Sequence, residues 1–290
     1  MLEAIRRLRY PVSNLWNEES NRHQGMRRLA TFIGWQLWKR LVGKPITVTL
    51  FNQARFVAYP DCQVSSGILY TRIPDSRNIL FLSKHLPGGT LIDVGADVGS
   101  VTLLLSDKID HAMLFEPNLL AAARARENPA VNRLNFKVHE LALSDTSGEV
   151  RFVCRDGVDT AARIIAHGQA SGVGTKIIQR ITFDEFLAQH RSPYPPISVV
   201  KIDVEGHENS VLRGMRQFLF EQRPGLVVFE YLQRTNIEET LRFFEEVRYQ
   251  VFELSEKGPV AVRQRIEPLQ DLFASPQECT GAIGVAGVKS

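Results

Sequence analysis

The 290-residue sequence lacks the features that mark disulfide scaffolds, membrane-spanning proteins and secreted precursors. Its three cysteines, Cys62, Cys154 and Cys279, are far apart and form no metal-type spacing, so reduced thiols in a reducing compartment are expected. The most apolar early run, residues 29–38, has ten residues, whereas a helix that spans a bilayer needs about twenty. No apolar stretch follows the basic N-terminal residues, so a signal peptide is not expected. The sequence therefore predicts a cytoplasmic location.

An excess of one charge is also absent from the chain as a whole. The 35 Lys and Arg residues and the 32 Asp and Glu residues leave a net charge of +3, which is too small by itself to indicate nucleic-acid binding. Hydrophobic residues make up 44% of the chain and charged residues 23%, a balance that is typical of globular proteins and excludes disorder. Acidic residues are nevertheless missing between residues 20 and 60, where seven Lys and Arg residues occur. This segment is therefore locally basic.

The first segment, residues 1–45, is predicted to be a basic amphipathic helical segment. Apolar residues recur there at steps of three and four, which is the period of a helix: Met26, Leu29, Ile33, Leu37 and Leu41. Through residues 20–45, such a helix could lie on an anionic membrane surface, which would make the protein peripheral to a membrane, or against an acidic partner. The alternative is a helix docked on its own domain with a solvated basic side, and this is the interpretation that we favour.

Residues 46–88 are predicted to lead into the main domain. Two β-prone runs, 46–51 and 55–59, are separated by three residues and predict a β-hairpin. Residues 78–86 then predict a short helix, which ends at a Pro-Gly-Gly sequence.

Residues 89–290 are predicted to form one α/β domain. Strand-like and helical stretches alternate, with strands at 90–94, 111–115, 135–139, 197–202, 225–230 and 249–253 and helices at 99–107, 118–128, 207–221 and 236–247. The alternation predicts a mostly parallel sheet with helices on both faces. An insertion at 154–176 interrupts the pattern, and it is either a cover over the ligand-binding edge or a simple surface loop.

The most specific motif is LIDVGADVGSVTLLLS, residues 91–106, which is typical of a buried strand, a glycine turn and an apolar helix. Asp93 lies near the end of the strand, and the turn passes through Gly95 and Gly99. Open α/β sheets bind ligands at the carboxyl ends of their strands, so this turn is expected to face a pocket. An acid in an otherwise hydrophobic strand favours this interpretation over a purely structural turn.

Two residues of the turn argue against a phosphate-bearing ligand. A dinucleotide site requires G-x-G-x-x-G, but Asp97 and Ser100 occupy the second and third glycine positions counted from Gly95. A carboxylate would repel a diphosphate at close range, and the P-loop pattern is absent from the sequence. The turn suits a ligand that has sulfonium and ammonium charges and no phosphate. S-adenosylmethionine is such a ligand.

A second strand end supports this prediction. The sequence MLFEPN, residues 113–118, places Glu116 at a strand end, 23 residues after Asp93. An acid at this point can accept hydrogen bonds from both ribose hydroxyls of an adenosine. A helix-capping role for Glu116 is less favoured, because Asn118 is the better N-cap candidate.

Two more stretches follow strands of the predicted sheet. In HELALSD, residues 139–145, the apolar residues could flank an adenine ring, and Ser144 or Asp145 could hydrogen-bond its edge. In VVKIDVEGHE, residues 199–208, a buried strand ends in acids before a glycine opens a helix. Ionisable residues at buried strand ends are candidates for function because unpaired charges there are costly.

Together these stretches resemble the FkbM family of S-adenosylmethionine-dependent methyltransferases. The resemblance runs from about residue 79 to residue 231 and is carried by IDVGADVGSVTL, FEPN, ALSD and KIDVEGHE. Asp97 is one departure, since the family usually has Asn there. The resemblance implies a class I methyltransferase (Rossmann-like) fold, S-adenosylmethionine as cofactor, and methyl transfer, usually to a hydroxyl oxygen. The residues expected at the cofactor are Asp93, Gly95, Ala96, Asp97, Gly99, Glu116, Pro117, Asn118, Ala142, Leu143, Ser144 and Asp203.

A hydroxyl acceptor must lose a proton, so a catalytic base is expected near the transferred methyl group. The candidates are Asp203, His207 and Glu230, which lies at the end of the next strand, in the run LVVFEY. His207 has the most convenient intrinsic pKa, although a place on a helix surface is the more common fate of a histidine. Asp203 and Glu230 could instead share a divalent ion such as Mg²⁺, but two carboxylates make a poor site, and no resident metal is expected.

Other classes of function are less favoured. A non-catalytic nucleoside-binding module would not need acids at Asp93, Glu116 and Asp203 together. A methyltransferase for exocyclic base nitrogens would be expected to show an Asn/Asp-Pro-Pro-Tyr/Phe turn after the fourth strand, where this chain has residues 203–206, DVEG. A dehydrogenase is disfavoured by Asp97. The expected acceptor is a hydroxyl of a small molecule, a glycan or a lipid, rather than a nucleic acid or a protein.

Overall fold

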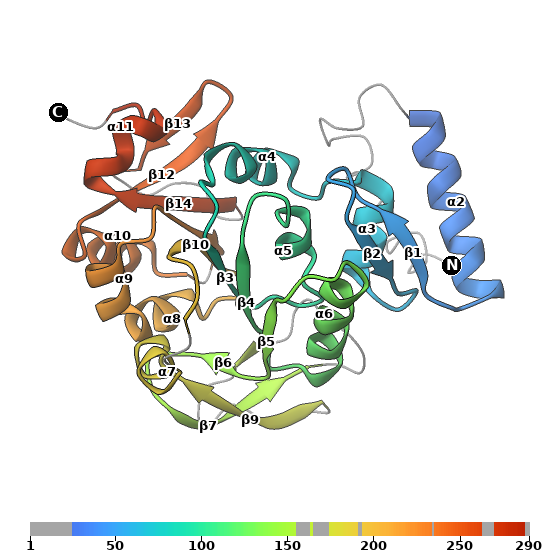
Figure 1. The fold of residues 1–290 in the computed structure, drawn as a ribbon, viewed down its shortest axis with the longest axis horizontal. Helices are drawn as coiled ribbons and strands as arrows, with labels where there is room; N and C mark the ends of the chain where they lie inside the picture. Colours follow the sequence, from blue (N-terminus) through green and yellow to red (C-terminus); the bar gives the residue numbers. More distant parts are fainter. Residues whose placement is uncertain are drawn as a thin grey trace.

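A large β-sheet forms the centre of the molecule (Figure 1). The computed structural model describes residues 25–154, 163–164, 174–190, 193–233, 235–262 and 270–287. Eight strands lie in the order β13-β12-β14-β11-β10-β3-β4-β5. Their bounds are β3 (Thr90–Val94), β4 (His111–Phe115), β5 (Lys137–His139), β10 (Ile197–Ile202), β11 (Leu226–Tyr231), β12 (Tyr249–Ser255), β13 (Gly258–Ala261) and β14 (Gln270–Pro276).

Most strands of this sheet run in one direction. The strands β5, β4, β3, β10 and β11 pair in parallel, and β12 shares their direction because it joins the sheet through the antiparallel strand β14. The predicted mostly parallel sheet is therefore confirmed. The register places Asp93 opposite Lys201 and Glu230 opposite Asp271, so charged residues from strands far apart in the sequence become neighbours.

Helices cover both faces of the sheet, as predicted. Leu91 and Leu114 point into an apolar cluster with α4, α5 and α6, whereas Ile92 and Phe115 point into a second cluster with α7 to α10. This division follows from the strand geometry, in which successive side chains point to opposite faces. The helix bounds are α4 (Ser76–His85), α5 (Ser100–Leu104), α6 (Leu119–Val131), α7 (Phe183–Gln189), α8 (Glu208–Gly214), α9 (Arg216–Gln222) and α10 (Ile237–Glu246).

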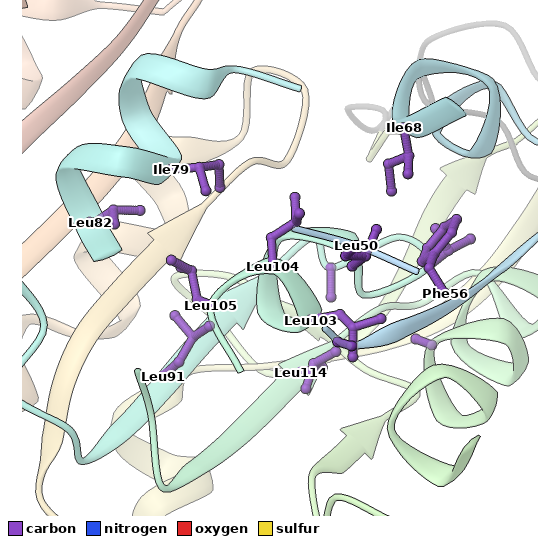
Figure 2. Close-up of a cluster of buried hydrophobic side chains, with 14 of the residues drawn as sticks. Leu50, Phe56, Ile68, Ile79, Leu82, Leu91, Leu103, Leu104, Leu105 and Leu114 are labelled. Atoms are coloured by element: carbon purple, nitrogen blue, oxygen red, sulfur yellow. The ribbon is translucent and has the colours of Figure 1, made fainter. Parts of the chain in front are cut away.

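An N-terminal layer packs on the first of these clusters. Figure 2 shows Leu50, Phe56 and Ile68 in the same group of buried side chains as Leu103 and Leu104 of α5. The hairpin is confirmed, because β1 and β2 pair in antiparallel register, but the helix α3 was not predicted. The bounds are α2 (Gly25–Leu41), β1 (Ile46–Thr49), β2 (Arg55–Ala58) and α3 (Gln63–Thr71).

A second, four-stranded sheet has the order β6-β9-β7-β8. It interrupts the α/β alternation where the sequence predicted an insertion, and most of that insertion, like residues 1–24, lies outside the described residues. The bounds are β6 (Ala142–Leu143), β7 (Gly148–Val153), β8 (Arg163–Ile164) and β9 (Thr175–Ile181).

The C-terminal half differs from the prediction in two places. The helix predicted at 207–221 is two helices, α8 and α9, which meet at Met215. Strand β14 was not predicted, and it is followed by η2 (Gln277–Cys279) and α11 (Thr280–Ile283). Within the described parts of the chain, no helix has the length and apolar character needed to cross a bilayer.

Candidate active site

A cavity of about 1020 Å³ opens at the carboxyl edge of the central sheet. Its walls come from the ends of β3, β4, β10 and β11, from the start of β14, and from the N-terminal helices α3 and α4. One part, here named the turn end, is lined by Gly95, Ala96, Asp97, Glu116, Pro117 and Asn118. Another part, here named the acid-rich end, is lined by Asp75, Asp203, Glu205, Glu230 and Asp271.

The turn after β3 is held against two neighbouring strands. The backbone N–H of Gly95 donates to the carbonyl oxygen of Phe115 at 2.9 Å, which ties the turn to β4. Gly95 has a φ of +74°, and a Cβ placed there would lie 1.8 Å from the carbonyl oxygen of Asp203. Only glycine fits at this position, since a side chain would be strained and would collide with the backbone after β10.

The carboxylates of Asp97 and Glu116 form the polar part of the turn end. The Glu116 side chain accepts hydrogen bonds from the backbone N–H groups of Asp97 (2.9 Å) and Asn118 (2.8 Å). Burial raises the pKa of Glu116 to about 7 and that of Asp97 to about 6. The buried Oδ2 of Asp97 has no hydrogen-bond partner among the described residues. Buried polar atoms usually have partners, so this oxygen is available for a ligand donor such as an ammonium group.

Apolar residues complete the turn end. Leu141, Ala142 and Leu143 line the cavity at and before β6, where the sequence predicted contacts with an adenine ring. Asn118 caps α6, because its side chain accepts from the N–H of Leu120 at 3.1 Å, which confirms the predicted N-cap. These apolar residues and Glu116 thus line the same cavity.

Three of the residues that the sequence predicted to contact the cofactor do not line the cavity: Asp93, Gly99 and Ser144. Each of them is buried behind its wall. Asp93 is fully buried, accepts a 2.6 Å hydrogen bond from the Thr102 hydroxyl, and lies 3.6 Å from the Lys201 ammonium. Gly99 is the N-cap residue of α5 and has a φ of +73°. The structure places these residues where they position the turn, and a direct contact with the cofactor stays a prediction for them.

The acid-rich end brings together two of the predicted catalytic candidates. Carboxylate oxygens of Asp203, Glu205 and Glu230 lie within 4.8 Å of one another. Burial, followed by the nearby charges of Asp203 and Glu205, raises the pKa of Glu230 to about 8. Three carboxylates at this spacing are suitable oxygen ligands for a divalent cation, whereas the sequence had indicated two.

Lys201 is a residue of this site that the sequence analysis missed. Its ammonium lies 3.1 Å from the Asp203 carboxylate and faces Asp93 from the neighbouring strand position. Burial alone would lower the pKa of Lys201, but the charges of Asp203 and Asp93 raise it above its usual value, so the lysine stays cationic. The sequence does contain an indication of its role, because a lysine inside the apolar run VVKI is unusual.

Other missed residues come from segments that the sequence analysis did not assign to the site. The amide of Asn78 donates to the Asp271 carboxylate at 2.7 Å, and burial, with the charge of Asp75, raises the pKa of Asp271 to about 7. Asp75 has its own pKa raised by burial. These residues precede or start α4 and β14, and no local sequence pattern connects them with the glycine turn.

His207 lines the cavity, but its ring is already engaged. Its Nε2 lies 2.9 Å from the Ser144 hydroxyl, and burial lowers the pKa of the ring, which favours its neutral form. Glu208, which follows it, is fully buried and accepts a 2.8 Å hydrogen bond from the N–H of Gly206. The sequence assigned no role to Glu208, and the structure shows that it holds the loop that carries Glu205.

The helix α3 forms part of the cavity wall that the sequence did not predict. Six of its residues line the cavity: Gln63, Val64, Ser66, Gly67, Tyr70 and Thr71. The α3 side of the cavity is in turn covered by α2, whose Gln36 donates to the Tyr70 hydroxyl at 2.8 Å. The N-terminal layer therefore belongs to the site as well as to the core.

The strand order, the glycine turn after β3 and the acid at the end of β4 define a class I methyltransferase fold of the Rossmann-like type. Residues 93–251 match the methyltransferase FkbM domain. This match covers more than half of the chain, and the chain belongs to that family.

Individual relatives are more distant. The hexuronic acid methyltransferase AglP of Haloferax volcanii is 34% identical over 155 residues, which is 52% of this chain and 59% of the relative. Among solved structures, a methyltransferase FkbM from Methylobacillus flagellatus is 15% identical, with a TM-score of 0.45 over 86% of this chain and 59% of the other. An O-methyltransferase from Bacillus cereus, solved with S-adenosylhomocysteine, is 14% identical, with a TM-score of 0.42 over 70% and 82% of the two chains. The chain thus spans about three fifths of the first two proteins.

Proposed function

We propose that this protein binds S-adenosylmethionine and transfers its methyl group to a hydroxyl oxygen of a sugar or of another small polyhydroxylated molecule. The observation that carries the proposal is the turn end, where a close-packed glycine, a buried Glu116 and an Asp97 oxygen without a hydrogen-bond partner in the described parts of the chain face one cavity. A sugar acceptor is supported by the relationship to a hexuronic acid methyltransferase.

The residues of the turn end fit this cofactor chemically. The Glu116 carboxylate, already oriented by two backbone N–H groups, can accept from ribose hydroxyls. The Asp97 carboxylate can accept from the ammonium of the methionine part, and a phosphate at the same place would be repelled. Residues 141–143 provide the apolar surface for the adenine ring. When bound, the cofactor supplies an activated methyl group.

The acid-rich end would handle the acceptor. Methyl transfer forms an oxygen–carbon bond while the sulfur–carbon bond breaks, and the hydroxyl proton passes to a base, which we assign to Asp203. Lys201 fixes the Asp203 carboxylate at 3.1 Å. Glu230, with its pKa raised to about 8, is protonated at pH 7 and can donate a hydrogen bond to an acceptor oxygen. His207 is the weaker candidate for the base because its Nε2 contacts Ser144.

A divalent cation held by Asp203, Glu205 and Glu230 is the alternative arrangement for the same reaction. Such an ion would orient acceptor oxygens and lower the pKa of a hydroxyl, so that Asp203 would act as a ligand instead of a base. The two arrangements differ in their sensitivity to chelation, which is tested below.

Calorimetry and a methyl-transfer assay test the proposal in two steps. S-adenosylhomocysteine should bind to the purified chain and NAD should not. Tight binding of NAD, together with no heat of binding for S-adenosylhomocysteine, would contradict the proposed cofactor. The chain is then incubated with methyl-labelled S-adenosylmethionine and with free and nucleotide-linked hexuronic acids, neutral hexoses and glycolipids. Label on a sugar hydroxyl is expected. Cofactor binding without transfer to any acceptor would favour the non-catalytic module.

A further inference from the structure

The helix α2 has two apolar faces, and one of them has no partner among the described residues. The first face packs on α3. The ring centroids of Phe32 and Tyr70 are 5.1 Å apart, and the indole N–H of Trp35 donates to the Ser66 hydroxyl at 3.0 Å. Phe32 and Trp35 are buried. This face is sufficient to dock the helix on its own domain.

The second face is a row of residues four positions apart, so all of them lie on one side of the helix. Leu29, Ile33, Leu37 and Leu41 are exposed by 46%, 50%, 51% and 80%. The sequence analysis expected this row to be the apolar side of the helix, yet the docked side is formed by Phe32 and Trp35 instead. Single exposed apolar residues are normal, but a continuous row marks an interaction surface.

Cations accompany the exposed row. Arg27 and Arg40 on α2, and Lys44 three residues after the end of the helix, are all exposed, and the chain has no Asp or Glu from residue 20 to residue 60. The exposed row and these three cations are named here the outer face of α2. Figure 1 shows α2 at the edge of the molecule, beyond α3 and the β1–β2 hairpin.

We propose that the outer face of α2 binds the surface of an anionic lipid bilayer. A helix with an apolar row, flanking Lys and Arg and no acids has the composition of an interfacial helix, which lies in the plane of the headgroups. With 17 residues and several charges, α2 is too short and too polar to span a bilayer. A second copy of the chain is a poorer occupant, because it would bring two basic surfaces together.

This surface is independent of the proposed methyl transfer. The outer face points away from α3, and α3 lies between α2 and the cavity that its residues line. Lipid binding can therefore be measured without cofactor or acceptor, and its failure would leave the proposed reaction untouched.

The test is flotation of the full chain with vesicles, once with phosphatidylcholine alone and once with phosphatidylcholine mixed with phosphatidylglycerol. We expect binding to the mixed vesicles, little binding to the neutral ones, and a decrease with salt. The variant Ile33→Ser/Leu37→Ser should weaken binding on the order of 100-fold, since two large side chains lose their insertion. Arg40→Gln/Lys44→Gln should weaken it by about fivefold per charge.

The matched control is Ile177→Ser/Phe220→Ser, which removes two apolar side chains that are exposed to a similar degree, 68% and 51%, on β9 and α9. It should bind the mixed vesicles as the unchanged chain does, with all variants checked for an unchanged melting curve. No binding of the full chain to mixed vesicles, or equal loss in the control, would overturn the proposal. So would a dimer in sedimentation velocity that Ile33→Ser/Leu37→Ser dissociates, because a second copy would then cover the face.

Discussion

The two ends of the cavity are built in opposite ways. The turn end comes from residues 94–118 and 141–143, a short piece of chain that forms two strand ends and the loops after them. The acid-rich end is assembled from residues around 75, 201–205, 230 and 271, which the sheet order and the N-terminal layer bring together. The proposed cofactor site is therefore built mainly from local sequence, whereas the proposed acceptor site depends on the tertiary fold.

Their electrostatics differ as well. At the turn end, each oxygen of Glu116 accepts one backbone N–H, so the carboxylate has a fixed orientation before any ligand arrives. At the acid-rich end, Glu230 and Asp271 are cross-strand neighbours with raised pKa values, and Lys201 is the cation that faces Asp203. Like charges at directly opposite strand positions are unfavourable, so this end is stabilised by protonation or by a bound ligand.

The largest effect is expected where the two ends touch. Gly95→Ala would place a Cβ 1.8 Å from the Asp203 carbonyl oxygen at a φ of +74°. The left-handed backbone costs about 1–2 kcal/mol for a residue with a side chain and overpacking about another 1–3 kcal/mol, so unfolding should become easier by roughly 2–5 kcal/mol. S-adenosylhomocysteine binding should be lost. Thermal melts and calorimetry measure both.

Gly284→Ala is the matched control for Gly95→Ala. Gly284 has nearly the same φ, +76°, but a Cβ there would meet nothing within 4 Å. Gly284→Ala should lower the free energy of unfolding only by the backbone contribution of about 1–2 kcal/mol. S-adenosylhomocysteine binding should stay unchanged. Equal losses in the two variants would show that the contact between the turn and Asp203 does not matter.

The second effect concerns turnover at the acid-rich end alone. Asp203→Asn keeps the size of the side chain and removes its charge, so transfer of label from S-adenosylmethionine should slow by roughly two to four decades. The affinity for S-adenosylhomocysteine and the melting temperature should change little. EDTA distinguishes the two roles, because activity falls on chelation only if Asp203, Glu205 and Glu230 hold a metal.

The control for Asp203→Asn is Glu246→Gln. Glu246 is paired with Arg216 and is 46% exposed, close to the 44% of Asp203, but it lies outside the cavity. The turnover of Glu246→Gln should match that of the unchanged chain. An Asp203→Asn variant with wild-type turnover would contradict both the base and the metal-ligand role.

The third effect isolates the turn end. Glu116→Ala removes the proposed hydrogen-bond acceptor for two ribose hydroxyls and should weaken S-adenosylhomocysteine binding by roughly 2–4 kcal/mol in calorimetry. Glu149→Ala, an exposed glutamate on β7, serves as the control and should bind normally. If Glu116→Ala binds as tightly as the unchanged chain, the ribose is held elsewhere.

The sequence predicted the turn end better than the acid-rich end for a physical reason. Strand, glycine turn and acid follow each other along the chain, so Gly95, Glu116 and the Asn118 cap could be identified locally. The contribution of Asp271 depends on β14, which inserts between β11 and β12, and no local pattern gives that order. Hydrophobic periodicity predicted α2, but periodicity does not say which of two apolar faces docks, and Phe32 and Trp35 were not recognised as the docking side.

The smallest expected effect is on the pH dependence of stability, which depends on the raised pKa values of the carboxyl groups at the two ends of the cavity. Burial raises the pKa of Glu230 to about 8 from the ordinary 4.5. Between these values the folded chain binds more protons than the unfolded chain, so the contribution to stability is complete below about pH 4.5 and is lost as the pH rises through 8. Glu116 and Asp271, each with a pKa near 7, act in the same direction.

The ligand-free protein should therefore melt at a lower temperature at pH 8 than at pH 5. Glu230 is only partly buried, so solvent screening reduces its contribution well below the full value of the pKa shift. Glu230→Gln should therefore flatten that decline by roughly 2–4 °C, which corresponds to about 1 kcal/mol for a chain of this size. The exposed Glu238→Gln on α10 should leave the slope as it is. A slope that Glu230→Gln does not change would mean that Glu230 is ionised in the folded protein at pH 7 and that the acid-rich end is less strained than its geometry indicates.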